Sequence, residues 1–334
     1  MTTTVAILGA GAWGTALAVH LATRAHAKPV VRLWARSAEQ ATTMSQSRVN
    51  ATYLNGVVIP AAVEITDDVA HAARADLLIV ATPVSALADV ATKLLATGAS
   101  APLAWLSKGF VESDGDWMLP HRRLAALWPT GVAVVSGPSF AEEVAKGLPT
   151  ALAIAATRAQ LASEIASLIR GDTLRAYESD DITGVETGGA VKNVLAIAAG
   201  ASDGLGFGYN ARAALVTRGL AEIMRLSVAL GARRETLMGL AGLGDLVLTC
   251  TGDASRNRRV GLGLAEGKPL ARILDELGHV AEGVVAARAV RAIAATHGVE
   301  MPICEAVDRV LHERMPVRDA VLGLLRREPR AEFH

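Results

Sequence analysis

Two lysines and one aspartate occupy contexts suited to proton transfer. Lys108 follows the apolar run at residues 103–106, and Lys192 stands three residues after the glycine pair at 188–189. Asp245 follows Gly244 at the end of a glycine-rich run. An ammonium group beside a carboxylate can give a proton to a reacting oxygen or take one from it, provided that it lies within about 3 Å. These three residues are therefore the candidate catalytic centre.

A second set of polar residues suits the binding of a phosphate. Ser255, Arg256 and Asn257 open a segment with helical spacing. A hydroxyl, a guanidinium and an amide at a helix N-terminus can surround a phosphate, with the unpaired N–H groups behind them. The neighbouring Arg258 and Arg259 are more simply interpreted as a solvated helix face.

The run Ser136-Gly137-Pro138-Ser139-Phe140 follows a probable strand and introduces another helix. It offers a second turn lined with N–H groups. In open α/β sheets, ligands bind at the edge formed by the carboxyl ends of the strands, and Lys108 is expected at the same edge.

Near the N-terminus, Gly9, Gly11 and Gly14 match the pattern G-x-G-x-x-G between an apolar strand and a helix. The first glycine permits a tight turn, the second lets the backbone approach a pyrophosphate, and the third lets helix and strand pack closely. This context predicts a dinucleotide site. A glycine-rich packing turn is the alternative.

Arg36 follows the second predicted strand, where an NAD-selective site usually has an acidic residue. A guanidinium suits the 2′-phosphate of NADPH, so the sequence predicts that NADPH is accepted. The alternative is a solvated surface arginine.

Lys192 lies on an otherwise apolar helical segment, and a lone lysine there could also be a surface residue. Two glycines inside a helix cost about 1 kcal/mol each, so Gly188 and Gly189 indicate close approach to a ligand or to another backbone. Histidine is the other usual proton donor, but the histidines lie mostly in charged or helix-end contexts. Surface or structural roles are expected for His20, His26, His71, His121, His279, His297, His312 and His334.

The predicted secondary structure that positions these residues differs between the first and second halves of the chain. Short apolar runs alternate with helical patterns at residues 5–8, 30–34, 76–81, 103–106, 132–135, 151–155 and 174–177. This alternation predicts an α/β fold with a doubly wound, mainly parallel sheet, although the last one or two strands could run antiparallel. After residue 181 only helical patterns follow, at 185–201, 211–230, 255–265, 284–296, 302–313 and 317–325. We therefore expect a nucleotide-binding domain at 1–183 and an all-α substrate domain at 184–334.

The composition argues against a nucleic-acid-binding, disulfide-rich or membrane-spanning protein. The 334 residues carry 33 basic and 33 acidic side chains, so no general attraction to nucleic acid or to an acidic membrane is expected. Cys250 and Cys304 are far apart in sequence, which predicts unpaired, inert thiols and a reducing cytoplasm. No uninterrupted apolar run reaches the ~18–20 residues of a membrane span, and no metal site is expected.

The chain resembles bacterial-type NAD(P)-dependent glycerol-3-phosphate dehydrogenase over nearly its whole length. The segments that carry the resemblance are Gly9-Ala10-Gly11-Ala12-Trp13-Gly14-Thr15-Ala16-Leu17-Ala18, Ser107-Lys108-Gly109, Ser136-Gly137-Pro138-Ser139-Phe140-Ala141, Gly188-Gly189-Ala190-Val191-Lys192-Asn193, Ser202-Asp203-Gly204-Leu205-Gly206-Phe207-Gly208, Gly239-Leu240-Ala241-Gly242-Leu243-Gly244-Asp245-Leu246-Val247-Leu248-Thr249-Cys250-Thr251 and Ser255-Arg256-Asn257-Arg258-Arg259.

The resemblance implies an enzyme that reversibly reduces dihydroxyacetone phosphate to sn-glycerol 3-phosphate with NAD or NADP, for glycerophospholipid biosynthesis. It implies that Lys192 is the proton donor and acceptor. The substrate contacts that it implies are Lys108, Gly137, Ser139, Lys192, Asp245, Ser255, Arg256 and Asn257. The cofactor contacts that it implies, beside the three loop glycines, are Trp13, Arg36, Lys108, Ala141, Arg256, Val280 and Glu282. A Rossmann-type domain, a helical domain and a homodimer are expected.

Two alternatives stay open from the residues themselves. One is another two-domain dehydrogenase acting on a different hydroxy compound, although the Ser255–Asn257 cluster favours a phosphate-bearing substrate. The other is a non-catalytic dinucleotide sensor, which would not need Lys192 with Asp245. The preference between NADPH and NADH also stays open.

Overall fold

The computed structural model describes residues 2–25, 28–278 and 280–326, so His26, His279 and His334 lie outside the described residues. The chain divides into two compact units. The first comprises Met1–Gly189 and Ala232–Asp245, and the second comprises Ala190–Gly231 and Leu246–His334. The division falls inside helix α8 (Ile182–Gly204), between Gly189 and Ala190.

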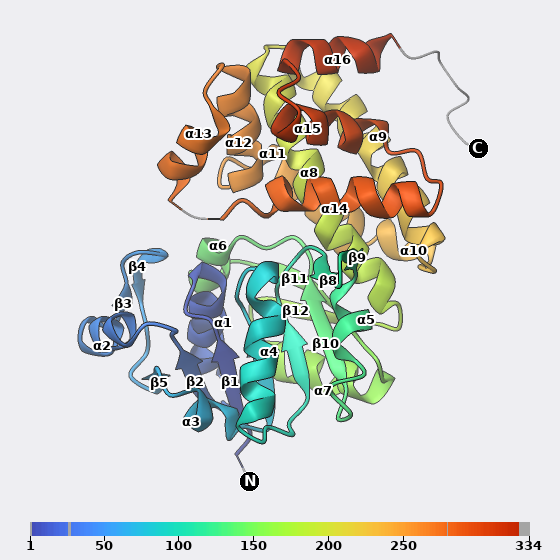
Figure 1. The fold of residues 1–334 in the computed structure, drawn as a ribbon. Helices are drawn as coiled ribbons and strands as arrows, with labels where there is room; N and C mark the ends of the chain where they lie inside the picture. The colour runs from blue at the N-terminus through green and yellow to red at the C-terminus, as the bar shows by residue number, and fades with distance from the viewer. Residues whose placement is uncertain (1, 26–27, 279, 327–334) are drawn as a thin grey trace. The chain divides into compact units, whose positions relative to one another are not determined.

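The first unit is built on an eight-stranded sheet with the order β12-β11-β10-β7-β6-β1-β2-β5 (Figure 1). All neighbouring strands pair in parallel except β10 and β11, which confirms a mainly parallel sheet with one antiparallel step near its end. The strands are β1 Thr4–Leu8, β2 Val30–Trp34, β5 Val63–Thr66, β6 Leu77–Val80, β7 Leu103–Trp105, β10 Val132–Ser136, β11 Thr150–Ala156 and β12 Leu174–Ser179.

Helices cover both faces of this sheet, so its central strands are apolar on both sides. In β1, Val5 and Ile7 join one buried core, while Ala6 and Leu8 join the other. Residues of α1, α2 and α7 complete the first core, and residues of α3, α4 and α5 complete the second. The helical segments are α1 Ala12–Thr23, α2 Ala38–Ser47, α3 Val69–Ala73, the 3₁₀ turn Val84–Ala86, α4 Leu87–Ala96, α5 Pro120–Leu124, α6 Ala141–Ala145, α7 Ala159–Ile169 and α10 Arg234–Leu237.

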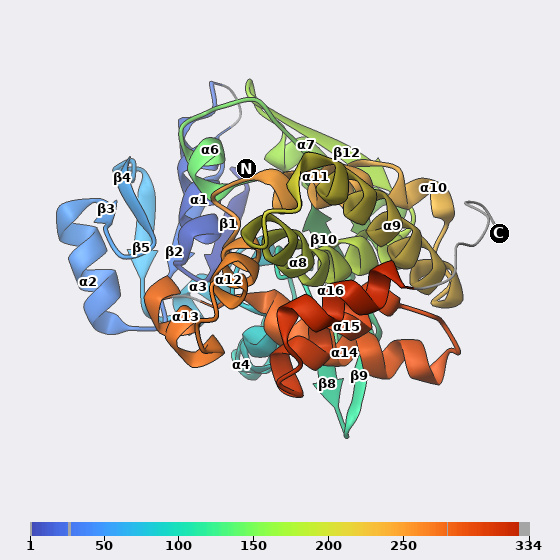
Figure 2. The same ribbon diagram turned by 90° about the horizontal axis from the view of Figure 1, so that it is seen from above.

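Two short antiparallel ribbons extend the first unit (Figure 2). One pairs β3 (Val49–Asn50) with β4 (Leu54–Val58), and the other pairs β8 (Val111–Ser113) with β9 (Asp116–Met118). The sequence analysis predicted neither ribbon, nor the edge strand β5. The central strands are as short but are marked by continuous apolar runs, whereas β4 and β5 mix polar with apolar residues and are only partly buried.

The second unit is helical throughout its described residues, as expected. Its helices after α8 are α9 Gly208–Ala229, α11 Asp245–Thr251, whose first residue belongs to the first unit, α12 Arg256–Ala265, α13 Leu270–Leu277, α14 Glu282–Thr296, α15 Pro302–His312 and α16 Val317–Leu325. Cys250 and Cys304 are both buried and unpaired, as predicted. Among the helices that the structure describes, none has the length and apolar character needed to cross a bilayer.

A buried carboxyl group joins two helices of the second unit and should make stability depend on pH. Glu222 on α9 accepts hydrogen bonds from the backbone N–H groups of Ile303 (2.7 Å) and Cys304 (3.2 Å), in the first turn of α15. Burial raises the pKa of Glu222 from 4.5 to about 7. A raised pKa means that the folded state binds the proton more tightly than the unfolded chain does. The stabilisation is therefore present below pH 4.5 and is lost as pH rises through 7.

We expect the free energy of unfolding to fall by about 2–3 kcal/mol more in the wild type than in Glu222→Gln between about pH 5 and 8, since one pKa unit corresponds to about 1.4 kcal/mol. Urea titrations at both pH values measure the difference. Glu305→Gln, which changes an exposed carboxyl of the same first turn of α15, is the control and should follow the wild type. Parallel pH profiles of Glu222→Gln and the wild type would contradict the prediction.

Candidate functional site

The glycine loop after β1 has the geometry of a dinucleotide cradle. Gly9 has φ +124°, and a Cβ on Gly14 would lie 2.0 Å from the carbonyl oxygen of Gly9, so side chains are excluded at both positions. A Cβ on Gly11 would meet no atom within 4 Å among the described residues. Gly11 is the N-cap of α1 and has no side chain with which to cap it. The loop therefore has open space beside its second glycine, next to a helix N-terminus that attracts anions.

Two side-chain amides that the sequence analysis missed hold this loop in place. Asn50 Nδ2 donates to the carbonyl oxygen of Ala10 (3.0 Å) and to Thr15 Oγ1 (2.8 Å). Gln40 Nε2 donates to the same carbonyl (2.8 Å). Asn50 is buried, and nothing in the mixed polar sequence around it marks it out.

Arg36 and Trp13, two of the predicted cofactor residues, lie just after β2 and at the start of α1. Arg36 is exposed and follows β2 by two residues, directly before Ser37, the N-cap of α2. Trp13 Nε1 donates to the carbonyl oxygen of Ser139 (3.1 Å), which links the glycine loop to the turn after β10. Ala141 is the first residue of α6, immediately beyond that turn.

A buried ion pair is the centre of the polar cluster in the first unit. Lys108 Nζ lies 2.6 Å from Asp245 Oδ2 and donates to the carbonyl oxygen of Gly137 (3.2 Å). Ser139 Oγ donates to the same carbonyl (3.0 Å). Asp245 is 1% exposed, so its charge is held in a low-dielectric setting. Four of the predicted substrate residues thus come together at the carboxyl edge of the sheet.

A π-helical turn at Leu240–Gly244 places Asp245 there. A Cβ on Gly242 would lie 2.0 Å from the carbonyl oxygen of Leu237, so only glycine fits in the turn. Single π turns inside helices are rare overall, and those that occur are often found at functional sites. The glycine spacing was visible in the sequence, but it does not identify this turn.

The glycine pair of α8 approaches the same region. A Cβ on Gly188 would lie 2.4 Å from the carbonyl oxygen of Ala241, and one on Gly189 would lie 2.9 Å from Ser136 Oγ and 3.5 Å from Lys108 Cγ. The expectation of close approach to another backbone is confirmed. Lys192 follows on the same helix, three residues beyond Gly189.

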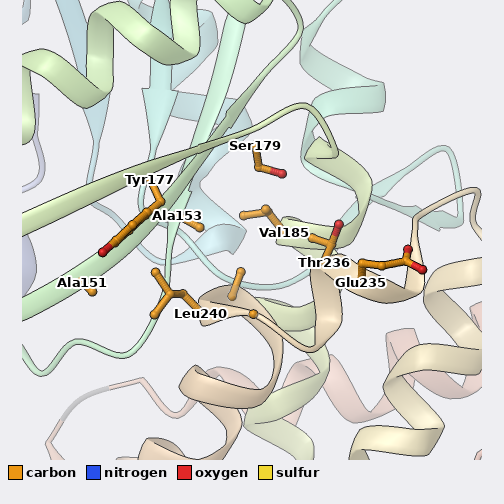
Figure 3. A pocket seen from close by; sticks show the side chains of 10 residues that line it. Ala151, Ala153, Tyr177, Ser179, Val185, Glu235, Thr236 and Leu240 are labelled. Atoms are coloured by element: carbon orange, nitrogen blue, oxygen red, sulfur yellow. The ribbon is translucent and has the colours of Figure 1, made fainter.

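The first unit also holds a pocket of about 390 Å³ (Figure 3). Its walls are mostly apolar, and they include Leu240 and Ala241 of the π-helical turn. The other lining residues are Ala151, Ala153, Tyr177, Ser179, Val185, Glu235, Thr236 and Gly239. The predicted site residues are not among these.

In the second unit, Lys192 is buried, with 6% of its surface exposed. Its Nζ donates to Thr249 Oγ1 on α11 (2.9 Å). The interpretation of Lys192 as a surface lysine is therefore wrong. The sequence analysis missed Thr249, although it lies four residues after Asp245 in the same motif and so faces the same side of a helix.

Asn257 connects three segments of the second unit. Its Nδ2 donates to Asn193 Oδ1 (2.9 Å), next to Lys192, and its Oδ1 accepts from the backbone N–H of Gly283 (3.0 Å) on α14. Glu282, one of the predicted cofactor residues, begins α14, and Val280 is half-exposed just before it. Asn257, a predicted substrate residue, is thus hydrogen-bonded to the residue after Lys192 and to the residue after Glu282. Asn193 is a further residue that the sequence analysis missed.

The start of α12 carries the predicted phosphate cluster. Ser255 is the N-cap, and its Oγ accepts from the backbone N–H of Arg258 (3.2 Å). Its hydroxyl hydrogen can still be donated to an anion. Arg256 is exposed and has no carboxylate partner among the residues that the structure describes. Its guanidinium is therefore available to a phosphate.

The interpretation of Arg258 and Arg259 as one solvated helix face is wrong for Arg258. The Arg258 side chain is 11% exposed and pairs with Asp203 at 2.8 Å. Arg259 is exposed, as expected. Helical spacing alone does not show which of two adjacent arginines turns towards a buried carboxylate.

Comparison with known proteins agrees with this arrangement. Residues 4–162 match the family model for the N-terminal part of NAD-dependent glycerol-3-phosphate dehydrogenase, and residues 181–322 match the model for its C-terminal part. The NAD(P)+ glycerol-3-phosphate dehydrogenase of Thiobacillus denitrificans is 54% identical over 330 residues, which cover 98% of this chain and 99% of that protein. The enzyme of the same name from Aromatoleum aromaticum is 54% identical over 332 residues, with 98% and 99% covered.

A solved structure is also similar over nearly the whole chain. The crystal structure of glycerol-3-phosphate dehydrogenase from Coxiella burnetii has a TM-score of 0.92 and 41% identity, and the alignment covers 98% of this chain and 99% of that one. Both the family models and the relatives span the two sets of polar residues described above. The chain belongs to the family of NAD(P)-dependent glycerol-3-phosphate dehydrogenases.

Proposed function

We propose that this protein reversibly reduces dihydroxyacetone phosphate to sn-glycerol 3-phosphate with NADPH or NADH, in the supply of glycerophospholipid precursors. The observation that carries the proposal is the buried Lys192, whose neighbour Asn193 is bonded to Asn257 of the phosphate cluster. A buried lysine whose sequence neighbour is hydrogen-bonded to the phosphate cluster suits a small phosphate-bearing ketone. Family membership supports the same reaction.

A direct assay tests this function. The absorbance of NADPH is followed with dihydroxyacetone phosphate and then with dihydroxyacetone. We expect turnover of the phosphate ester and much slower turnover of the unphosphorylated ketone. Turnover of both at equal rates would indicate a different dehydrogenase, and turnover of neither would indicate a dinucleotide sensor.

In the proposed mechanism, Lys192 carries the proton. When bound, the reduced nicotinamide supplies the hydride for the C2 ketone. The Lys192 ammonium gives its proton to the oxygen at C2, and in the reverse direction the neutral amine removes the proton of the alcohol. The bond from Nζ to Thr249 Oγ1 orients the amine, and burial keeps water from competing for the proton.

We propose that Lys108, Gly137, Ser139 and Asp245 act on the same substrate. Asp245 holds the Lys108 ammonium in one position, and an ammonium so held can donate to a substrate oxygen. Ser255, Arg256 and Asn257 bind the phosphate together with the first N–H groups of α12.

The residues proposed to hold the dinucleotide belong to the glycine loop and to later segments. Gly9, Gly11 and Gly14 form the cradle for the pyrophosphate. Trp13, Arg36, Lys108, Ala141, Arg256, Val280 and Glu282 complete the proposed set. We propose a nucleotide-binding domain at 1–183 and a substrate domain at 184–334, although each also supplies residues to the other set: Lys108, Gly137 and Ser139 to the substrate, and Arg256, Val280 and Glu282 to the cofactor.

Arg36 should decide how well the phosphorylated cofactor is used. We expect Arg36→Asp to lower the ratio of kcat/KM for NADPH to kcat/KM for NADH by about 10–100-fold, because charge-assisted hydrogen bonds contribute about 1.5–3 kcal/mol and about 1.4 kcal/mol is a factor of ten. Initial rates with each cofactor give the ratio. Arg74→Asp, a change of an arginine outside the proposed site, is the control. An unchanged ratio in Arg36→Asp would contradict the proposed binding of the 2′-phosphate by Arg36.

We also propose a homodimer in the cytoplasm. Closed twofold dimers are the commonest oligomers, and the two buried, unpaired thiols suit a reducing compartment. The mass of the purified protein by light scattering tests the dimer: a mass of twice 34.6 kDa is expected, and a monomer mass would contradict it.

A further inference from the structure

A buried ion cluster lies beside the phosphate-binding helix of the second unit, in a motif to which no role has yet been given. Asp203 is near the end of α8, and its Oδ2 accepts from Arg258 Nε (3.0 Å), Arg258 Nη2 (2.8 Å) and Arg212 Nη1 (2.9 Å). The three side chains are only 11–16% exposed. One carboxylate thus holds two guanidinium groups with little water around them.

We propose that Asp203 is a positioning residue for substrate binding. It fixes Arg258, and through Arg258 it fixes the first turn of α12, which carries Ser255, Arg256 and Asn257. Asp203 touches no substrate in this proposal. The inference rests on the proposed function, because it assumes that these three residues bind the phosphate.

Arg258 connects the carboxylate to the phosphate cluster through two different groups. Its backbone N–H donates to Ser255 Oγ, the cap of α12 (3.2 Å), while its side chain reaches Asp203. Its Nη1 also donates to Asp253 Oδ1 (2.8 Å), but Asp253 is 98% exposed. Exposed ion pairs contribute little, typically 0–1 kcal/mol, so Asp203 is the stronger anchor of the two.

The close contact between α8 and α12 explains why the position of Arg258 affects the start of α12. A Cβ on Gly200 would lie 1.9 Å from the carbonyl oxygen of Arg258, and a Cβ on Gly261 would lie 2.0 Å from the carbonyl oxygen of Ile197. The two helices lie side by side in Figure 2 with backbone against backbone. No layer of side chains lies between them at these points to absorb a shift, so a displaced Arg258 must carry the first turn of α12 with it.

Removing the charge of Asp203 would have opposite effects under two explanations. Asp203→Asn would leave two nearly buried guanidinium groups without their carboxylate, and breaking such a cluster is strongly unfavourable. If Asp203 positions the first turn of α12, the phosphate should bind more weakly. If Asp203 acts only as a charge near the site, its removal adds net positive charge, and the phosphate should bind more tightly.

The test compares Asp203→Asn with Asp253→Asn, which removes the exposed partner of the same arginine. We expect Asp203→Asn to raise KM for dihydroxyacetone phosphate by about tenfold or more, with kcat within about threefold of the wild type. Calorimetry should show the same weakening of the dissociation constant for sn-glycerol 3-phosphate. Asp253→Asn should match the wild type, and Asp203→Glu should restore part of the affinity.

Several outcomes would overturn the inference. An unchanged or lowered KM in Asp203→Asn would do so, as would a loss of kcat and thermal stability at constant KM, because a purely structural role reduces the active fraction and not the affinity of what remains. The wild-type assay distinguishes a failure of the positioning role from a failure of the proposed function. If the wild type does not reduce dihydroxyacetone phosphate, the proposed function fails. If it does while Asp203→Asn keeps its KM, only the positioning role fails.

Discussion

Replacing Lys192 with alanine should lower kcat for the reduction of dihydroxyacetone phosphate by about 10²–10⁴-fold, the usual effect of losing a general acid. Lys192 is buried and oriented by Thr249 Oγ1, so water cannot readily replace its ammonium group. KM for NADPH should change little, because the glycine loop lies on β1 and α1 and does not depend on this side chain. Stopped-flow or steady-state rates with NADPH give both quantities.

Chemical rescue makes this prediction specific to proton transfer. Alanine leaves space where the lysine stem was, and a small primary amine in solution should restore part of kcat in Lys192→Ala. Lys93→Ala, which removes an exposed lysine on α4, is the control and should behave as the wild type. Near-normal kcat in Lys192→Ala would show that another group donates the proton.

Replacing Arg256 with alanine should raise KM for dihydroxyacetone phosphate by about 10–100-fold or more, because a charge-assisted hydrogen bond to phosphate contributes about 1.5–3 kcal/mol and a forked pair contributes more. Arg256 is exposed at the start of α12, without an ion pair among the described residues, whereas Arg258 on the same turn is held by Asp203. At saturating NADPH, the slow rate with dihydroxyacetone should not change, since that ketone has no phosphate.

Arg259→Ala is the matched control for this variant, because Arg259 is exposed on the same helix three residues further on. It should keep the KM of the wild type. Because a purely electrostatic attraction to the whole basic run would weaken both variants equally, equal losses in Arg256→Ala and Arg259→Ala would contradict a specific phosphate contact. High salt provides a second check, since it screens a general attraction more than a direct contact.

The central strands were predictable because they are buried on both faces, and the long helices because their length lets helical spacing show. Strands β1 and β6 are examples of the first kind, and α9 and α14 of the second. Several edge and surface elements, among them β5 and α2, were not predicted. Helix α2 has a near-neutral mixture of alanine, threonine, serine and glutamine, with only Ala41 and Met44 buried, so its sequence carries no clear apolar stripe.

Candidate site residues were found wherever a motif needs a particular side chain or glycine. Lys108, Lys192, Asp245 and the Ser255–Asn257 cluster all stood out in this way, and the structure shows Lys108 paired with Asp245. Thr249, Asn193 and Asn50 were missed, because a single polar residue, whether in an apolar or a mixed segment, has no distinctive type or spacing. Their roles rest on hydrogen bonds to residues 35–64 positions away along the chain.

The sequence alone was enough to predict the fold class, the dinucleotide loop and the family, because glycine spacing and apolar periodicity can be recognised within short runs of consecutive residues. Only the tertiary structure decided which charges are buried and what each one pairs with. Two adjacent arginines, Arg258 and Arg259, have identical chemistry and similar spacing, yet one is held by Asp203 and the other is exposed. That difference arises because the direct backbone contact of α8 with α12 brings a carboxylate from a distant part of the chain to one arginine and not to its neighbour.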